Sequence, residues 1–163
     1  MTSYRRSTSA WAQYLFRLGS TREKEINLII MEHKIELVKK YFALVENFCA
    51  DKKEYEDILH SEMSATEFPN LNTKVTRKRG YDEMFAGMET AKKILRSHHI
   101  EIHAIFETPE VAVIEATWTG EMAVAVRDFE KGQTLTAHCC FIFEFRDGRI
   151  FRQRNYDCYE SFE

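Results

Sequence analysis

Three features are missing from this chain of 163 residues, and each absence excludes a class of protein. No apolar run approaches the roughly 20 residues that a membrane-spanning helix needs. The formal net charge is −3, so basic residues do not outnumber acidic ones, and the composition gives no indication of nucleic-acid binding. The four cysteines, at 49, 139, 140 and 158, show no paired spacing of the kind that holds a metal ion. We therefore expect a soluble protein with reduced, structural thiols.

What is present suits one folded domain. Hydrophobic residues make up 44% of the chain, and 2 Trp, 7 Tyr and 12 Phe supply large side chains for a core. Hydrophobic periodicity predicts a helix over 23–50, with Ile30 in its apolar stripe, and another over 81–96, with a short helix between them that Asp51 caps. A strand over 60–68 ends at the turn Pro69-Asn70. Four more alternating strands follow, over 100–106, 112–118, 134–146 and 149–157. In the first, strict alternation puts Ile100, Ile102, Ala104 and Phe106 on one inward face. Because no parallel crossover pattern is visible, we expect an α+β domain with a curved antiparallel sheet wrapped on three helices.

The first 22 residues differ from the rest because they contain arginine, serine and threonine but no acid. Their large apolar residues, Trp11, Tyr14, Leu15 and Leu18, fall at helical spacing. This composition is typical of an organelle transit peptide, although the apolar run of a secretory signal is absent. A docked or frayed terminal helix, or a translation start placed too far upstream, is the interpretation that we favour. We thus expect a cytoplasmic protein with an extension over 1–22 and a domain over 23–163.

The last two predicted strands meet at Asp147-Gly148, a two-residue turn that predicts a β-hairpin between alternating runs. In perfect register, three phenylalanines of the first strand would share one face with two arginines of the second. Phenylalanine needs burial and arginine resists it. A one-residue bulge near Phe151 removes the conflict, because it moves the arginines to the outer face. The residues in conflict are Phe141, Phe143, Phe145, Arg152 and Arg154.

The same bulge turns Gln153, Asn155 and Asp157 inward, beside the phenylalanines. The result is a polar edge with one acid on an apolar cavity. Such a combination is typical of a small-molecule site.

Four segments carry a resemblance to a known family. They are Lys40-Tyr41-Phe42-Ala43-Leu44-Val45, Thr66-Glu67-Phe68-Pro69, Ile114-Glu115-Ala116-Thr117-Trp118-Thr119-Gly120, and Phe145-Arg146-Asp147-Gly148-Arg149-Ile150 with Tyr156-Asp157. In order and spacing, from about Ile35 to the C-terminus, they resemble the SnoaL-like and ketosteroid-isomerase-like group of the nuclear transport factor 2 superfamily. The resemblance implies a cone-shaped α+β roll of the cystatin-like kind, with one deep pocket. It also implies a homodimer through the outer sheet face, formed here by Cys140, Ile142, Glu144, Arg152, Arg154 and Tyr156.

The family's catalytic residues match this chain only in part. In ketosteroid isomerases, a helix tyrosine and a buried protonated aspartate stabilise a dienolate oxyanion while a second aspartate moves the proton. Tyr41 matches the tyrosine, but Phe68 stands at the position of the base and Phe141 near that of the buried acid. SnoaL-like polyketide cyclases use an aspartate late in the final strand as general acid and base, and Asp157 matches it. Phe143 stands where those cyclases have a histidine.

The residues themselves also support Asp157. A carboxylate at the rim of an apolar pocket loses hydration, so its pKa rises toward the range of a general base. Asn155 could hold that carboxylate or a substrate carbonyl, and Tyr41 would donate to the developing oxyanion. The alternative is a structural carboxylate that caps the cone or pairs with an arginine. Glu67 is a second acid near the same mouth, although its strand phase beside Pro69 favours an exposed side chain.

The histidines of this sequence are weaker candidates for a metal or catalytic site. His99 and His103 share a strand face, but four strand steps separate them by roughly 13 Å, too far for one metal ion. His138 would oppose Asp157 only if the hairpin had no bulge, so we expect it to face outward.

Two function classes remain open. The first is a cofactor-free isomerase, cyclase or lyase that moves a proton next to a carbonyl of an apolar ring compound. The second is a module that binds an apolar or aromatic metabolite without turning it over. Fold analogy cannot decide between them. In both, we expect the ligand to contact the pocket residues Trp118, Phe141, Gln153, Glu67, Met84 and Met88.

Overall fold

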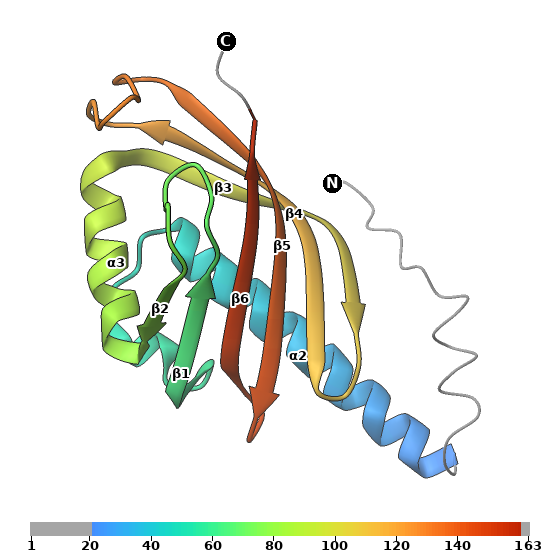
Figure 1. Cartoon of the computed structure of the whole chain (residues 1–163). Helices are drawn as coiled ribbons and strands as arrows, with labels where there is room; N and C mark the ends of the chain where they lie inside the picture. Colours follow the sequence, from blue (N-terminus) through green and yellow to red (C-terminus); the bar gives the residue numbers. More distant parts are fainter. Residues whose placement is uncertain (1–20, 161–163) are drawn as a thin grey trace.

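The structure is a computed structural model that describes residues 21–160, so the expectations for residues 1–20 lie outside the described residues. Figure 1 shows a curved sheet with helices against one face. The elements are α2 (Thr21–Glu46), the 3₁₀-helix η1 (Lys52–Tyr55), β1 (Leu59–Glu67), β2 (Arg77–Gly80), α3 (Tyr81–Ile94), β3 (Leu95–Glu107), β4 (Val111–Met122), β5 (Thr134–Arg146) and β6 (Arg149–Tyr159). None of the helices in this part of the chain is long and apolar enough to cross a membrane.

The strand order is β2-β1-β6-β5-β4-β3, with β2 and β3 at the two edges. Helix α3 contacts β2 and β1 near one edge and also β3 at the other edge. One helix can reach both edges only if the sheet curls around it, and Figure 1 shows the bend. The predicted α+β class and the wrapped sheet are therefore confirmed.

Two details of the predicted architecture were wrong. The sheet is not wholly antiparallel, because β1 runs parallel to β6. The described residues contain two α-helices and one 3₁₀-helix rather than three full helices, and the short edge strand β2 was not predicted. Pairing between β1 and β6 joins segments far apart in the chain, and hydrophobic periodicity carries no information on such partners.

Helix α2 has two unlike halves. Its C-terminal half buries an apolar stripe at helical spacing, with Val38 at 1% exposure and Phe42 at 4%. The first half exposes four apolar side chains, so the prediction that Ile30 belongs to the core stripe was wrong. The helix ends at Glu46, short of the predicted residue 50, because Phe48 adopts a left-handed φ of 50°. The exposed side chains are Ile26, Leu28, Ile29 and Ile30.

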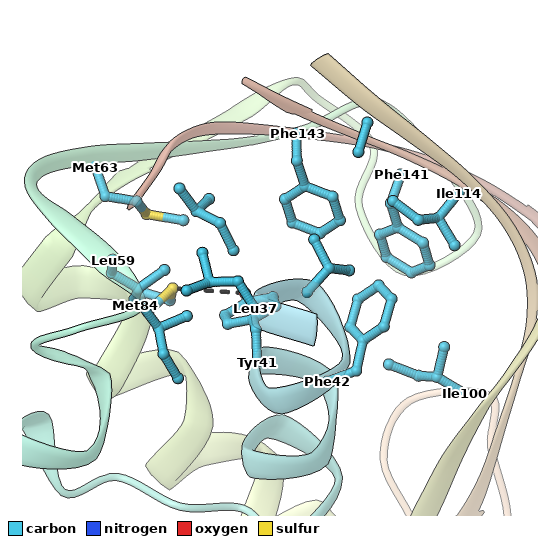
Figure 2. Packing of buried hydrophobic residues seen from close by; sticks show 14 of the residues in the cluster. Leu37, Tyr41, Phe42, Leu59, Met63, Met84, Ile100, Ile114, Phe141 and Phe143 are labelled. Carbon is cyan, nitrogen blue, oxygen red and sulfur yellow. Dashed lines mark hydrogen bonds between the residues drawn. The ribbon is translucent and has the colours of Figure 1, made fainter. Parts of the chain in front are cut away.

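The core joins α2 to β5 through aromatic rings. Figure 2 shows Tyr41 and Phe42 directed toward Phe141 and Phe143. The ring centroids of Phe42 and Phe141 lie 5.0 Å apart at 60°, and those of Tyr41 and Phe143 lie 5.8 Å apart at 78°. Tilted contacts of this kind suit the charge distribution of aromatic rings. They fix the helix against the inner face of the sheet.

The β5–β6 hairpin contains the predicted bulge. Phe145 pairs with Ile150 but Glu144 pairs with Arg152, so Phe151 is the extra residue. Beyond the bulge, Phe143 faces Gln153 and Cys139 faces Asp157. On the outer face, Arg152 and Arg154 both form ion pairs with Glu144. The conflict between buried phenylalanine and arginine thus predicted this register correctly.

A second bulge, in β3, was not predicted. Ile102 pairs with Ala116 while Ala104 pairs with Glu115, so His103 is the extra residue. Past this point the strand changes face: Ile105 packs on the core, and Phe106 is 42% exposed. The prediction that strict alternation carries Phe106 inward was therefore wrong.

Candidate functional site

The inner face of the sheet and the helices enclose a cavity of about 290 Å³. All nine residues predicted for the site line it. Their expected roles remain predictions, but their common location is an observation. They are Tyr41, Glu67, Met84, Met88, Trp118, Phe141, Gln153, Asn155 and Asp157.

A hydrogen-bonded chain of three side chains crosses the buried end of the cavity. The Tyr41 hydroxyl donates to Gln153 Oε1 at 2.8 Å, and Gln153 Nε2 donates to Asn155 Oδ1 at 2.8 Å. Tyr41 is 5% exposed and Gln153 is 6% exposed. Desolvation raises the pKa of Tyr41, so its proton stays on the hydroxyl at neutral pH. Because Asn155 Oδ1 is an acceptor in this chain, its Nδ2 is left without a hydrogen-bond partner among residues 21–160.

Asp157 lies two residues further along β6, on the same face. No Lys, Arg or His among the described residues lies within ion-pair distance of its carboxylate. Burial raises the pKa of Asp157, and the negative charge of Glu67 raises it further. The nearby thiol of Cys139, its partner across the ladder, opposes part of this shift. An arginine partner for Asp157, one form of the structural alternative, is thus absent from residues 21–160.

Glu67, the second acid of the cavity, has fixed partners. Its Oε2 accepts from Arg79 Nη1 at 3.0 Å, and its Oε1 accepts from Asn70 Nδ2 at 3.1 Å. The side chain is 19% exposed and lines the cavity, so the expectation of an exposed Glu67 was wrong. Arg79 comes from β2, the strand that the sequence did not predict.

Trp118 on β4 and His98 on β3 form a further part of the cavity wall. Trp118 Nε1 donates to His98 Nδ1 at 3.0 Å, and His98 Nε2 lies 2.9 Å from the carbonyl oxygen of Val45. The imidazole therefore carries its proton on Nε2, where it donates to Val45. Burial lowers the pKa of His98, which keeps the ring neutral. With both nitrogens engaged, His98 has no free position for proton transfer.

His99, His103 and His138 lie apart from this chemistry. His138 is exposed and pairs with Glu160 rather than with Asp157, as expected from the bulge. His99 contacts Glu46 and His103 contacts Thr117 Oγ1. Among residues 21–160, no three His, Cys, Asp or Glu side chains are grouped as metal ligands. All four cysteines are free.

Several lining residues were missed in the sequence. His98 and Arg79 were absent from the predicted site, as were Cys139 and Tyr159. Cys139 and Tyr159 could have been found, because both continue inward alternations that the hairpin had already defined. Arg79 gave no local signal, since its position depends on the pairing of β1 with β2.

The comparison with protein families identifies the chain. The sequence pattern of the SnoaL-like domain matches residues 38–153, so the chain belongs to this family. The match covers the buried part of α2, strands β1 to β5, the first half of β6 and most of the cavity lining, and it ends before Asn155 and Asp157.

Solved structures show the same fold at low sequence identity. IdmH from Streptomyces antibioticus, a proposed polyketide cyclase, is 8% identical with a TM-score of 0.64, covering 76% of this chain and 91% of its own. An epoxide hydrolase from M. tuberculosis is 17% identical with a TM-score of 0.57, covering 80% and 84%. A ketosteroid isomerase-like protein from Catenulispora acidiphila, solved with trimethylamine, is 12% identical with a TM-score of 0.57, covering 74% and 84%. The comparison with curated proteins gives no significant match. These likenesses show the fold alone.

Proposed function

We propose that the protein is a cofactor-free enzyme that moves a proton next to a carbonyl group of an apolar ring compound. Asp157 is the general base, and the same residue returns the proton as general acid. The apolar wall of the cavity holds the ring, with Trp118, Phe141, Met84 and Met88 as contacts. Isomerases, cyclases and lyases share this first step.

One observation carries the proposal: Asp157 is a desolvated carboxylate without a cationic partner. A structural carboxylate is normally satisfied by a cation or by backbone N–H groups, because an unpaired buried charge is costly. Asp157 has neither kind of partner among the described residues, and burial raises its pKa above the ordinary range of aspartate. A raised pKa improves a carboxylate as a base near pH 7. Glu67 cannot serve equally, because Arg79 and Asn70 hold both of its oxygens.

Stabilisation of the oxyanion falls to Asn155 in this proposal. We first expected Tyr41 to donate to the oxyanion, but its hydroxyl proton is directed to Gln153 Oε1. Gln153 in turn fixes the amide of Asn155, leaving Nδ2 as the donor for an oxyanion. Tyr41 and Gln153 are thus positioning residues for Asn155.

Solvent deuterium exchange tests the proton transfer without knowledge of the final product. The protein would be incubated in D₂O with ring ketones such as 2-tetralone, and loss of the α-proton signal would be followed by NMR. We expect faster exchange with the protein, and a fall of at least about 100-fold in the Asp157→Asn variant with affinity within a few fold. Asp147→Asn is the matched control, because Asp147 lies in the exposed hairpin turn with its side chain 80% exposed. Ketones that bind without faster exchange, or an active Asp157→Asn variant, would refute the enzyme.

A binding module is the second candidate. This alternative is favoured by the absence of a second free acid for proton transfer. Among the described cavity residues, Asp157 is the one carboxylate without an ion-pair partner. Under this alternative the same ketones bind with micromolar affinity and no exchange follows.

We also propose a homodimer through the outer sheet face. Tyr156 is 42% exposed there and stacks on Phe68 at 4.6 Å, beside the paired arginines of β6. Aromatic and arginine side chains are enriched at protein interfaces. Sedimentation at micromolar concentration checks this; a monomer would refute it.

A further inference from the structure

We propose that Trp118 is a fixed platform on which a planar, unsaturated ligand stacks, and that His98 and Gly120 set the orientation of its ring. This inference rests on the proposed function in one respect, because both use the same cavity. It adds a ligand class, planar rings over saturated ones, and two positioning residues that the catalytic proposal does not need.

Gly120 supplies the space for the indole. A Cβ atom at this position would lie 2.4 Å from Cη2 and 2.5 Å from Cζ2 of Trp118, distances that real atoms do not tolerate. The ring therefore lies over the backbone of Gly120, two residues further along the same face of β4. The backbone of Gly120 does not require glycine, since the positive-φ glycines are Gly132 and Gly148 among the described residues. Its role at this point is space for the ring.

His98 fixes the ring from the side. It pairs with Gly120 across the ladder, which brings its Nδ1 to the indole Nε1 that donates to it. The bond of His98 to Val45 of α2 and its contact with the Phe48 ring, at 4.5 Å between centroids, hold the imidazole in turn. The indole is thus restrained through two elements outside its own strand.

A restrained aromatic wall favours a particular ligand shape. Trp118 rests on the sheet at Gly120 and lines the cavity, while the Tyr159 ring meets it edge-on, at 6.0 Å and 68°. A flat unsaturated ring gains stacking with the indole that a puckered saturated ring does not. Because the indole is already held in place, binding costs little side-chain entropy.

The test compares two ketones with one carbon skeleton, 2-tetralone and trans-2-decalone. Only the former contains an aromatic ring, and calorimetry measures both affinities on the full-length protein. We expect the wild type to bind 2-tetralone roughly 2- to 10-fold more tightly. Gly120→Ala and His98→Phe should each lose this preference, while the affinity for trans-2-decalone changes by no more than a few fold. Gly80→Ala is the matched control, because Gly80 does not line the cavity and a Cβ there would meet its nearest atom, Glu83 Oε2, at 3.8 Å, an ordinary contact.

Fluorescence anisotropy provides a second readout that needs no ligand. The sequence contains two tryptophans, so Trp11→Phe leaves Trp118 as the single tryptophan, which excitation at the red edge of the absorption band selects over tyrosine. We expect the ring to move with the whole protein in this background and to show local nanosecond motion after His98→Phe. This comparison also decides the case if Gly120→Ala fails to fold.

The outcomes separate the two proposals. Equal affinities of the wild type for both ketones, or an unchanged ring mobility in His98→Phe, would overturn the platform and leave the proton transfer intact. A retained preference for 2-tetralone without deuterium exchange would support the platform and overturn the enzyme. No binding of either ketone would overturn both.

Discussion

Two acids lie at the same cavity, on neighbouring parallel strands, and their surroundings are opposite. Glu67 at the end of β1 is held by Arg79 and Asn70, whereas Asp157 near the end of β6 forms no ion pair within residues 21–160 and lies beside the Cys139 thiol. Glu67 pairs with Asn155 across the two strands, so two sequence positions on β6 separate its partner from Asp157. The difference shows that closeness to a cavity does not define a functional acid. What distinguishes Asp157 is that no other group in the described structure neutralises it.

The polar groups of the cavity fall into the same two kinds, those with a partner in the protein and those without one. We call a polar group committed if it has a hydrogen-bond or ion-pair partner within the protein. Examples are Tyr41 with Gln153 and Glu67 with Arg79, and such groups stabilise the fold through their partners. A buried polar group without such a partner, an uncommitted group, lowers the stability of the fold and is available to a ligand. Substitutions in the two sets should therefore change stability in opposite directions.

The largest effect is expected at the most buried committed pair. Gln153→Leu keeps the volume but leaves the Tyr41 hydroxyl without its oxygen acceptor, so we expect a loss of about 1–3 kcal/mol in the free energy of unfolding. Urea denaturation measures it. The double variant with Tyr41→Phe should recover part of the loss, because the orphaned hydroxyl is then gone. This account would be contradicted if the double variant lost more unfolding free energy than the two single variants together.

A smaller loss is expected at Glu67. The ion pair with Arg79 is partly exposed, at 32% for Arg79 and 19% for Glu67, so Glu67→Gln should cost about 1 kcal/mol rather than the full value of a buried pair. Thermal unfolding measures it. Glu62→Gln is the control: its pair with Arg146 is far more exposed, at 70% for Glu62, and should contribute little. Equal effects of the two substitutions would remove the distinction between cavity and surface pairs.

The effect at Asp157 should have the opposite sign and depend on pH. A raised pKa in the folded state means that folding favours the protonated carboxyl, so ionisation destabilises the wild type as pH rises above the unfolded value of about 3.9. At neutral pH, Asp157→Asn should therefore be as stable as the wild type or slightly more stable. The gain should vanish below pH about 4, where both states are protonated. Urea midpoints of both proteins across this range check the sign, and a variant that is less stable at pH 7 would favour a structural role.

The smallest effect is expected from removal of residues 1–22. The buried stripe of α2 begins at Lys34 and Ile35, well inside the described part of the chain. We expect a change in melting temperature within the range of surface substitutions. A large decrease would show that the aromatic residues of this segment contribute to the core.

Residues close together in the sequence predicted the polar side of the site. The pairing of strands that are far apart in the sequence could not be predicted. The bulge at Phe151 followed from phenylalanine and arginine competing for one face, and it placed Gln153, Asn155 and Asp157 together correctly. By contrast, the commitment of Glu67 depends on Arg79, which reaches it through the pairing of β1 with β2. No alternation or turn signal encodes that pairing.

The role of Tyr41 shows the same limit at the level of one hydrogen bond. Its position on the buried stripe of α2 was predictable from helical spacing. The direction of its hydroxyl proton toward Gln153 depends on how α2 packs on β6. The sequence could therefore identify the residue but not whether it would donate to a ligand or to the protein.

Titration of the Asp157 carboxyl is the measurement that tests the central claim most directly. Carboxyl ¹³C signals would be followed by NMR from pH 2 to 9, with Asp157→Asn used to assign the signal. The account predicts that Asp157 titrates clearly above the ordinary range of aspartate, because burial and the charge of Glu67 both disfavour its ionised form. A pKa at or below about 3.9 would mean that the folded protein stabilises the charged carboxylate. Asp157 would then be a committed structural group, and the proposed base would be refuted.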